Sequence, residues 1–300
     1  MVFVEPGDRI HFLDWGAPEL ADGAGGSSSG PGWSSGPGIL LIHGLSNTAW
    51  SWAPVARSLR AERRVVAMDL RGHGLSDAST EAYAPDLLAE DVVAVAEGSG
   101  LLARAGDRVV LVGHGFGAIV AAWAARALGD RCAGLVLVDG GWEDLATATG
   151  MDTDEFLRGL DEPPEVMRSL EAFLADRAAF DPATWDADQD RAARATVVET
   201  HAGRVVPATR PHALEACVRT MFEYDPETTL AQVCLPVIAL LAADDETGSR
   251  EKALARAAAA REAAGGSPIR VLSFGRDGHN LMRYRAQAVT AAILEADEPG

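Results

Sequence analysis

Residues 108–122 read R-V-V-L-V-G-H-G-F-G-A-I-V-A-A, and the rest of the chain is best interpreted from this stretch. The apolar run at residues 109–112 is typical of a buried strand, and an apolar helical segment starts at about Phe116. Only a few residues separate the two, so the stretch predicts a strand, a sharp turn and a helix. Gly113 and Gly117 stand where the strand and helix backbones must pass closely.

Gly115 stands at the centre of this turn. In the pattern Gly-x-nucleophile-x-Gly, a sharp strand-to-helix turn exposes a nucleophilic side chain at the middle position. The segment G-H-G-F-G fits that pattern everywhere except at the middle, where glycine offers no side chain. Such a turn holds its central residue at positive φ, so glycine relieves strain of about 1–3 kcal/mol and the fold is expected to survive.

The composition is that of an ordinary globular protein. The 300 residues are 48% apolar and 23% charged, which suits an α/β domain with an insertion. The net charge of −18 argues against nucleic acid and membrane surfaces as partners. We recognise no signal peptide and no transmembrane run, and the three cysteines lack metal or C-x-x-C spacing, so a cytoplasmic protein with reduced thiols is expected.

Buried strands alternate with helices through most of the chain. Besides the run at 109–112, strands are expected within residues 2–15 and at 38–42, 65–68, 134–138, 236–241 and 269–274. This alternation implies right-handed crossovers, and therefore an α/β fold with a mostly parallel sheet and helices on both faces. A Gly/Ser/Pro-rich segment at residues 17–38 is predicted to be a flexible loop.

The alternation stops between residues 141 and 225. This segment has no buried strand run and carries 18 acidic residues against eight arginines. We therefore predict a core domain formed by residues 1–140 and 226–300, with an all-helical insert over 141–225. The insert starts and ends at the carboxyl edge of the sheet, where open parallel sheets bind their ligands, so it is expected to cover that edge as a lid.

Five motifs, in order, make the chain resemble the α/β-hydrolase family. They are H-G-L-S at 43–46, M-D-L-R-G-H-G-L-S-D at 68–77, the turn at 113–117, L-L-A-A-D-D at 240–245 and D-G-H-N at 277–280. The turn at 113–117, called the elbow below, is followed in the chain by the acid and then by the histidine, which is the order found in that family. The resemblance implies an eight-stranded sheet, and the chain departs from the family pattern at Gly115.

The resemblance also implies roles for residues that follow the strands. His279 is the general base, and Asp245 is the acid that orients its imidazole, with the neighbouring Asp244 less favoured. Asp139 follows another strand and is a further candidate acid, against the alternative of a structural cap.

Other residues are expected to support the site. By resemblance, the backbone N–H groups of Leu45 and Phe116 form an oxyanion hole. The ligand is expected near His43, Gly44, His114 and Trp142, although His43 is better explained as a hydrogen-bonding support and Trp142 equally well as core. Neither Ser46 nor Cys132 stands on the elbow, so neither is expected to replace the nucleophile. Loop scaffolding is the expected role of Arg71, His73 and Ser76.

Three functions are compatible with an Asp/His pair beside a glycine elbow. The favoured one is a hydrolase in which His279, backed by Asp245, activates water or abstracts a substrate proton directly. The alternatives are a ligand-binding or accessory protein without turnover, and a serine esterase whose serine has been replaced by glycine. The acidic insert favours a neutral, apolar small-molecule substrate such as an ester, lactone or ketone. No cofactor or metal is expected, since no phosphate loop or ligand cluster is recognised.

Overall fold

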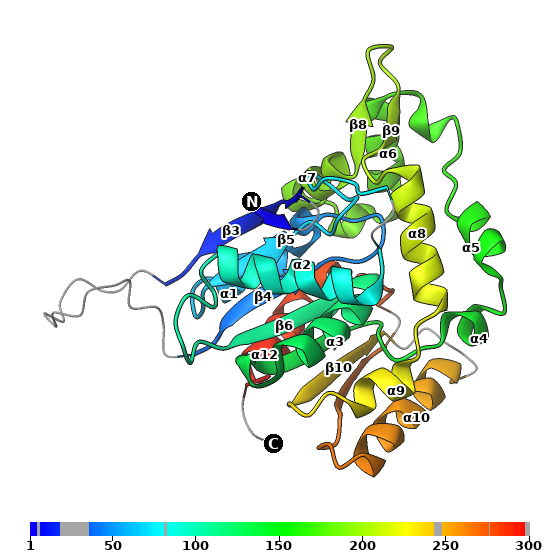
Figure 1. The fold of residues 1–300 in the computed structure, drawn as a ribbon. Helices are drawn as coiled ribbons and strands as arrows, with labels where there is room; N and C mark the ends of the chain where they lie inside the picture. Colours follow the sequence, from blue (N-terminus) through cyan, green and yellow to red (C-terminus); the bar gives the residue numbers. More distant parts are fainter. Residues whose placement is uncertain (5–6, 19–35, 81–82, 243–247, 276, 298–300) are drawn as a thin grey trace, which may run out of the picture.

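A seven-stranded sheet forms the centre of the computed structural model, which describes residues 1–4, 7–18, 36–80, 83–242, 248–275 and 277–297. Its strand order is β11-β10-β7-β6-β4-β5-β3 (Figure 1). The strands are β3 (Phe12–Gly16), β4 (Gly38–Ile42), β5 (Val65–Met68), β6 (Val109–His114), β7 (Cys132–Val138), β10 (Val237–Ala242) and β11 (Arg270–Phe274). All neighbours pair in parallel except β3, which runs antiparallel to β5, so the predicted mostly parallel sheet is confirmed.

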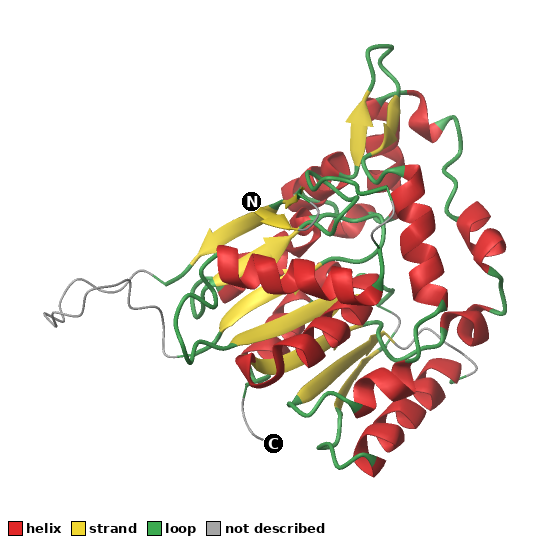
Figure 2. Cartoon of the chain, in the orientation of Figure 1, coloured by secondary structure: helices red, strands yellow, loops and turns green. Residues whose placement is uncertain are grey.

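Helices cover both faces of the sheet because its strands are apolar on both sides. Along β4, Leu40 and Ile42 belong to one buried core, whereas Ile39 and Leu41 belong to the other, as the period-two geometry of a strand requires. The first core includes α2 (Pro85–Gly98), α3 (Phe116–Leu128) and α10 (Ser249–Ala263). The second includes α1 (Ala53–Leu59) and α12 (Ala286–Leu294). Figure 2 shows helices on both sides of the strands.

The start of the chain does not add an eighth strand to the sheet. Among the described residues, β1 (Val2–Val4) and β2 (Asp8–Ile10) instead pair with each other in a separate antiparallel sheet. β1 packs on α2 at Gly98, where an added Cβ would lie 2.1 Å from Cγ1 of Val2. β1 therefore packs on a helix of the core domain and is not part of the seven-stranded sheet. Most of the loop predicted at residues 17–38 lies outside the described residues.

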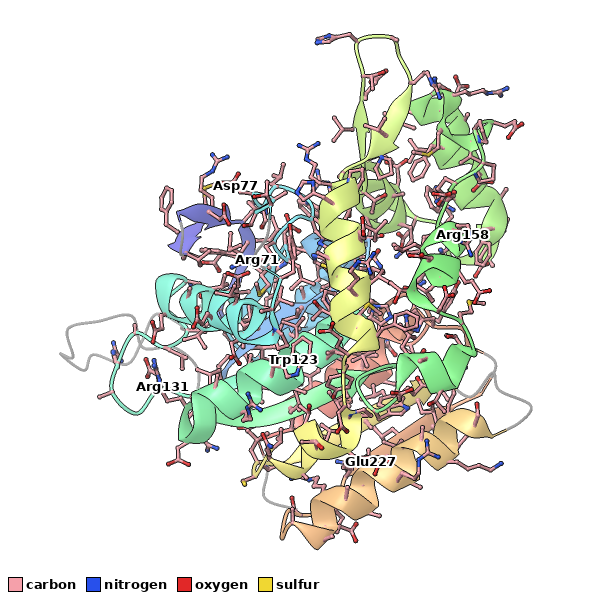
Figure 3. The ribbon with its side chains drawn as sticks, turned by 45° about the vertical axis from the view of Figure 1, so that its right-hand side comes forward. Arg71, Asp77, Trp123, Arg131, Arg158 and Glu227 are labelled. Carbon is pink, nitrogen blue, oxygen red and sulfur yellow. The ribbon has the colours of Figure 1, made fainter. Side chains whose placement is uncertain are left out.

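The insert follows β7 and leads into β10. It contains α4 (Leu145–Thr149), α5 (Thr153–Gly159), η3 (Val166–Arg168), α6 (Leu170–Phe180), η4 (Pro182–Thr184), α7 (Ala187–Ala195), β8 (Val197–Glu199), β9 (Val205–Pro207) and α8 (Pro211–Phe222). α9 (Pro226–Ala231) then packs beside α10. Figure 3 shows α8 standing between the sheet domain and α5, the helix that carries the labelled Arg158.

The prediction that the insert is all-helical is wrong. β8 and β9 form an antiparallel hairpin, which stands at the top of Figure 1. Two Val-Val pairs, at 197–198 and 205–206, flank a turn in which Gly203 N donates to Thr200 O at 2.9 Å. Each strand has only three residues and is partly exposed, so it lacks the long apolar run on which the prediction relied.

Described contacts tie the insert to the core domain. Arg57 of α1 forms an ion pair with Asp188 of α7, and the guanidinium of Arg191 lies 4.5 Å from the ring centroid of Trp50. Trp50 belongs to η1 (Ala49–Trp52), which follows the H-G-L-S motif. The insert therefore lies over residues that follow β4. Within the described ranges, we find no helix with the length and apolarity needed to cross a bilayer.

Candidate active site

The turn between β6 and α3 brings two backbones into close contact. Gly115, at its centre, has a φ of +52°. A Cβ added to Gly113 would lie 2.1 Å from the carbonyl oxygen of Gly117, and one added to Gly117 would lie 2.3 Å from the carbonyl oxygen of His43. No larger residue fits at either position without movement of the backbone. The close approach predicted for these two glycines is therefore present.

The Cβ direction at Gly115 points to His279. A Cβ added there would lie 3.1 Å from Nε2 and 3.5 Å from Cε1 of that imidazole. His279 follows β11 and precedes α11 (Leu281–Tyr284), and 56% of its side chain is exposed. The structure thus brings one ring nitrogen of His279 to the point where an elbow nucleophile would stand.

Asp139 binds the other ring nitrogen. Nδ1 of His279 lies 2.6 Å from Oδ2 of Asp139, whose side chain is fully buried. A carboxylate at Nδ1 keeps the proton of the neutral imidazole there, which leaves the lone pair of Nε2 facing Gly115. The structure therefore places the less favoured candidate acid beside the histidine. Asp244 and Asp245 lie outside the described residues, so the role predicted for Asp245 stays a prediction.

A network of donors surrounds the Asp139 carboxylate. Oδ1 accepts a hydrogen bond from the backbone N–H of Ala242 at 2.8 Å and lies 2.9 Å from Nη1 of Arg250. Arg250 also pairs with Glu143 at 3.1 Å. Burial lowers the pKa of Arg250, but these two carboxylates outweigh burial and raise it overall. Arg250 could not be singled out from the sequence because a single arginine in a helix carries no motif.

Gly140 is a second residue of the site for which the sequence predicted no role. A Cβ added to it would lie 2.7 Å from Cα of Gly115, so the loop after β7 presses directly on the elbow. Gly115 N also donates to Val138 O at 3.1 Å. The doubled glycine after Asp139 was the available signal, because a Gly-Gly pair marks a close backbone approach.

Backbone at or next to the two predicted oxyanion donors lies near the elbow, and their role stays a prediction. Phe116 is the first residue of α3, so its N–H has no acceptor within the helix. The Cα of Gly44, the neighbour of Leu45, would lie 3.9 Å from a Cβ on Gly115. Ser46 and Asp139 are the non-glycine residues with positive φ in the described part of the chain, at +59° and +49°. Such strained backbone is often found at functional sites.

Two buried histidines support the site from behind. His43 bridges two strand ends, since its Nδ1 lies 2.7 Å from Gly44 O and its Nε2 accepts from the N–H of Leu70 at 3.0 Å. Nε2 of His114 lies 3.0 Å from the carbonyl oxygen of His279, and the two rings stand 4.3 Å apart. His114 thereby fixes the backbone of His279 beside the elbow. The structure gives both residues a supporting position rather than one in a pocket.

The other residues considered from sequence take part in core packing or in loop contacts. Trp142 is buried in the core, and burial raises the pKa of Cys132, at the opposite end of β7, to about 12. In the loop after β5, Arg71 pairs with Asp91, His73 packs on His43, and Ser76 donates to Asp69 O. The described residues contain no group of three or more His, Cys, Asp or Glu that could hold a metal ion.

A pocket of about 330 Å³ opens beside these groups, between the core domain and the insert. On the core side it is lined by residues that adjoin the site, namely Leu45, Ser46 and Asn280. On the insert side it is lined mainly by apolar residues, which include Met167, Phe173 and Val197. The pocket therefore offers a space of the size of a small molecule next to residues that neighbour the elbow and His279 in the chain or in space.

Acid is expected to destabilise the protein through its buried histidines. Burial lowers the pKa of His43, His73 and His114, to about 3 for His73, whereas histidine in an unfolded chain titrates near about 6.5. Below that pH the unfolded chain binds protons that the folded chain does not, so stability present at neutral pH is lost as the pH falls from about 6.5.

His73 alone is expected to cost roughly 2 kcal/mol of unfolding free energy between pH 7 and pH 5. Urea titrations of the wild type and of His73→Gln at both pH values measure this cost. The variant should lose less stability on acidification than the wild type. Identical pH dependence in the two proteins would contradict the prediction.

Comparison with known sequences finds a family that covers most of the chain. A sequence model described as "Alpha/beta hydrolase family" matches residues 39–292. Protein phosphatase methylesterase 1 of Mus musculus is 36% identical over 149 residues, which are 46% of this chain and 35% of that protein. Esterase PIR7B of Oryza sativa subsp. japonica is 35% identical over 127 residues, 40% of this chain and 44% of that protein. The matches thus span less than half of these curated relatives.

The fold has close counterparts among solved structures. The crystal structure of E-2-(acetamidomethylene)succinate hydrolase superposes with a TM-score of 0.72 at 23% sequence identity. The superposition covers 89% of this chain and 93% of that one, so the two share a fold over nearly their whole length.

Proposed function

The chain belongs to the alpha/beta hydrolase family, and on that premise we propose that it hydrolyses a small ester or lactone without a side-chain nucleophile. His279 and Asp139 act as a general-base pair that activates a water molecule at the centre of the elbow. The observation that carries the proposal is the position of His279 between two groups. A Cβ added to Gly115 would lie 3.1 Å from its Nε2, and its Nδ1 lies 2.6 Å from Oδ2 of Asp139.

The proposed reaction moves one proton to His279 and back. Water gives a proton to Nε2 as its oxygen attacks the carbonyl carbon of the ester. The backbone N–H groups of Leu45 and Phe116 stabilise the resulting oxyanion. When the tetrahedral intermediate collapses, its bond to the alcohol oxygen breaks, and the imidazolium returns the proton to that oxygen. A carboxylic acid and an alcohol leave the site.

Glycine at position 115 determines this route. Without a side-chain hydroxyl no acyl-enzyme can form, so the acyl group must pass directly to water. Enzymes that lose one member of a catalytic triad retain about 10³–10⁴-fold acceleration over water, which comes from the oxyanion hole and from substrate binding. The proposed activity is therefore slow compared with that of an enzyme carrying the full triad.

Replacement of His279 by alanine tests the proposal. It is expected to reduce hydrolysis of p-nitrophenyl butyrate by about 10²–10⁴-fold, which is the usual contribution of a general base. The measurement is the initial rate of nitrophenol release above the buffer rate. His201→Ala is the matched control, because His201 is an exposed residue between β8 and β9. An unchanged rate in His279→Ala would overturn the proposal.

The lack of a nucleophilic side chain at Gly115 favours a second candidate function, which is ligand binding without turnover. A pocket beside an intact Asp/His pair can hold an ester even when nothing attacks it. In that case the wild type would release no nitrophenol above the buffer rate, yet it would bind a non-hydrolysable amide of the same acid.

A further inference from the structure

We propose that the pocket binds a substrate that carries a single carboxylate, and that Arg283 recognises it. The inference rests on the proposed function in one respect, since it takes the pocket beside Gly115 as the substrate site. It then narrows the substrate class to esters or lactones with a free carboxylate, of which the half-ester of a dicarboxylic acid is the simplest example.

Arg283 stands within reach of the reacting atoms. It lies in α11, four residues after His279, and it lines the same pocket as Leu45 and Asn280. Four residues of chain span at most about 14 Å. The Cα atoms of His279 and Arg283 are therefore close enough for the proposed ligand to place its carbonyl at the elbow and its charged group at Arg283.

Arg283 is held in place without an ion-pair partner in the described part of the chain. Its Nε donates to Oγ1 of Thr184 at 2.7 Å, and its Nη2 donates to the carbonyl oxygen of Asp181 at 3.0 Å. The carboxylate of Asp181 is engaged elsewhere, with Ala183 N at 3.1 Å and Thr184 Oγ1 at 2.9 Å. The guanidinium therefore keeps its charge and further N–H groups available for a ligand.

The second arginine of the pocket differs from Arg283 in this respect. Arg177 forms ion pairs with Glu162 and with Asp176 on the insert. Glu162 also lines the pocket, so the charged residues of the described lining are two arginines and one glutamate. The pocket is thus locally cationic in a chain whose net charge is −18.

A guanidinium fixed by two hydrogen bonds is well suited to a carboxylate. Its planar donors match the two carboxylate oxygens, and a charge-assisted hydrogen bond is stronger than a neutral one. The apolar residues Met167 and Phe173 line the same pocket and suit the hydrocarbon part of such a ligand. This assignment replaces the expectation of a neutral substrate, which rested on the summed charge of the insert.

Binding of 3-phenylpropionate and of its neutral amide, 3-phenylpropanamide, tests the proposal. In titrations of the full chain followed by NMR, the wild type should bind the acid at least about tenfold more tightly than the amide. Arg283→Gln should weaken binding of the acid by about ten- to a hundredfold and change binding of the amide less than about twofold. Arg283→Lys keeps the charge without the planar fork, so its affinity for the acid should be intermediate.

Arg168→Gln is the matched control, because Arg168 is an exposed arginine of the insert. It should bind both ligands as the wild type does. Equal affinity of the wild type for acid and amide would overturn the proposal, and so would a preference for the acid that survives in Arg283→Gln. If Arg283→Gln does not fold, the proposal is still tested by the ratio of the wild-type affinities for acid and amide and by the affinity of Arg283→Lys for the acid. Binding is measured without turnover, so a failure of the proposed hydrolysis is distinguishable from a failure of carboxylate recognition.

Discussion

Gly115→Ser is expected to raise kcat on activated esters by at least about 100-fold, because it restores the missing member of a triad. A Cβ at position 115 lies 3.1 Å from Nε2 of His279, so the hydroxyl of serine comes within hydrogen-bond reach after a shift of the ring. The ring has room for that shift, since 56% of the side chain is exposed. The gain should be visible as a burst of nitrophenol release and as covalent labelling of residue 115 by a phosphonate ester.

Gly115→Ala is the matched control for this gain. It adds the same Cβ at the same positive φ, so both variants should lose about 1–3 kcal/mol of unfolding free energy. Only serine should gain activity, because alanine has no hydroxyl. If serine is no faster than alanine, the groups around the elbow do not form a hydrolytic site, and the ligand-binding alternative becomes the better explanation. A serine enzyme whose nucleophile has been replaced would show the same gain, and turnover by the wild type separates that alternative from the proposed hydrolysis.

Asp139→Asn is expected to lower hydrolysis in the Gly115→Ser background by about 10⁴-fold. An asparagine keeps the shape of the side chain but no longer fixes the proton of His279 on Nδ1. The measured quantity is kcat on p-nitrophenyl butyrate, with KM expected to change little because the pocket is unaltered. In the wild-type background the loss should be about 10²–10⁴-fold, the contribution of the general base that Asp139 orients.

Asp245→Asn is the comparison that decides which carboxylate orients the histidine. The family spacing favours Asp245, whereas the 2.6 Å contact in the structure favours Asp139. If Asp139 is the acid, its replacement should lower kcat far more than that of Asp245. The opposite result would make Asp139 a structural residue that accepts hydrogen bonds from Ala242 and Arg250.

The sheet was predictable because its strands are covered on both faces. β4, β5 and β7 are nearly continuous apolar runs, and such runs identify strands without any knowledge of their partners. The β8–β9 hairpin was not predictable in this way, since its three-residue strands are partly exposed and its stability depends on local pairing. Among the described residues, β1 pairs with β2 outside the central sheet, and its contact with α2 through Val2 is a tertiary contact that no local pattern predicts.

The candidate site was partly predictable for a similar reason. His279 and Gly115 stand in local motifs, so their positions at the carboxyl edge follow from the order of strands. Several carboxylates follow strands equally well, and only the fold determines which of them reaches the imidazole. Arg250 and Arg283 act through contacts with residues about a hundred positions away, for which a single sequence holds no signal. Net charge likewise hides a cationic pocket inside an acidic chain.

The contact between Gly140 and Gly115 has a consequence for redesign. Backbone touches backbone there, and a hydrogen bond from Gly115 N to Val138 O joins the same two loops. Side-chain rotation cannot change the spacing between the backbones of residues 115 and 140, because direct contact and a backbone hydrogen bond join the two loops. Cysteine, aspartate or an unnatural amino acid introduced at 115 would therefore start from the same backbone position beside the imidazole. Differences in rate among such variants would report the reactivity of the attacking group itself.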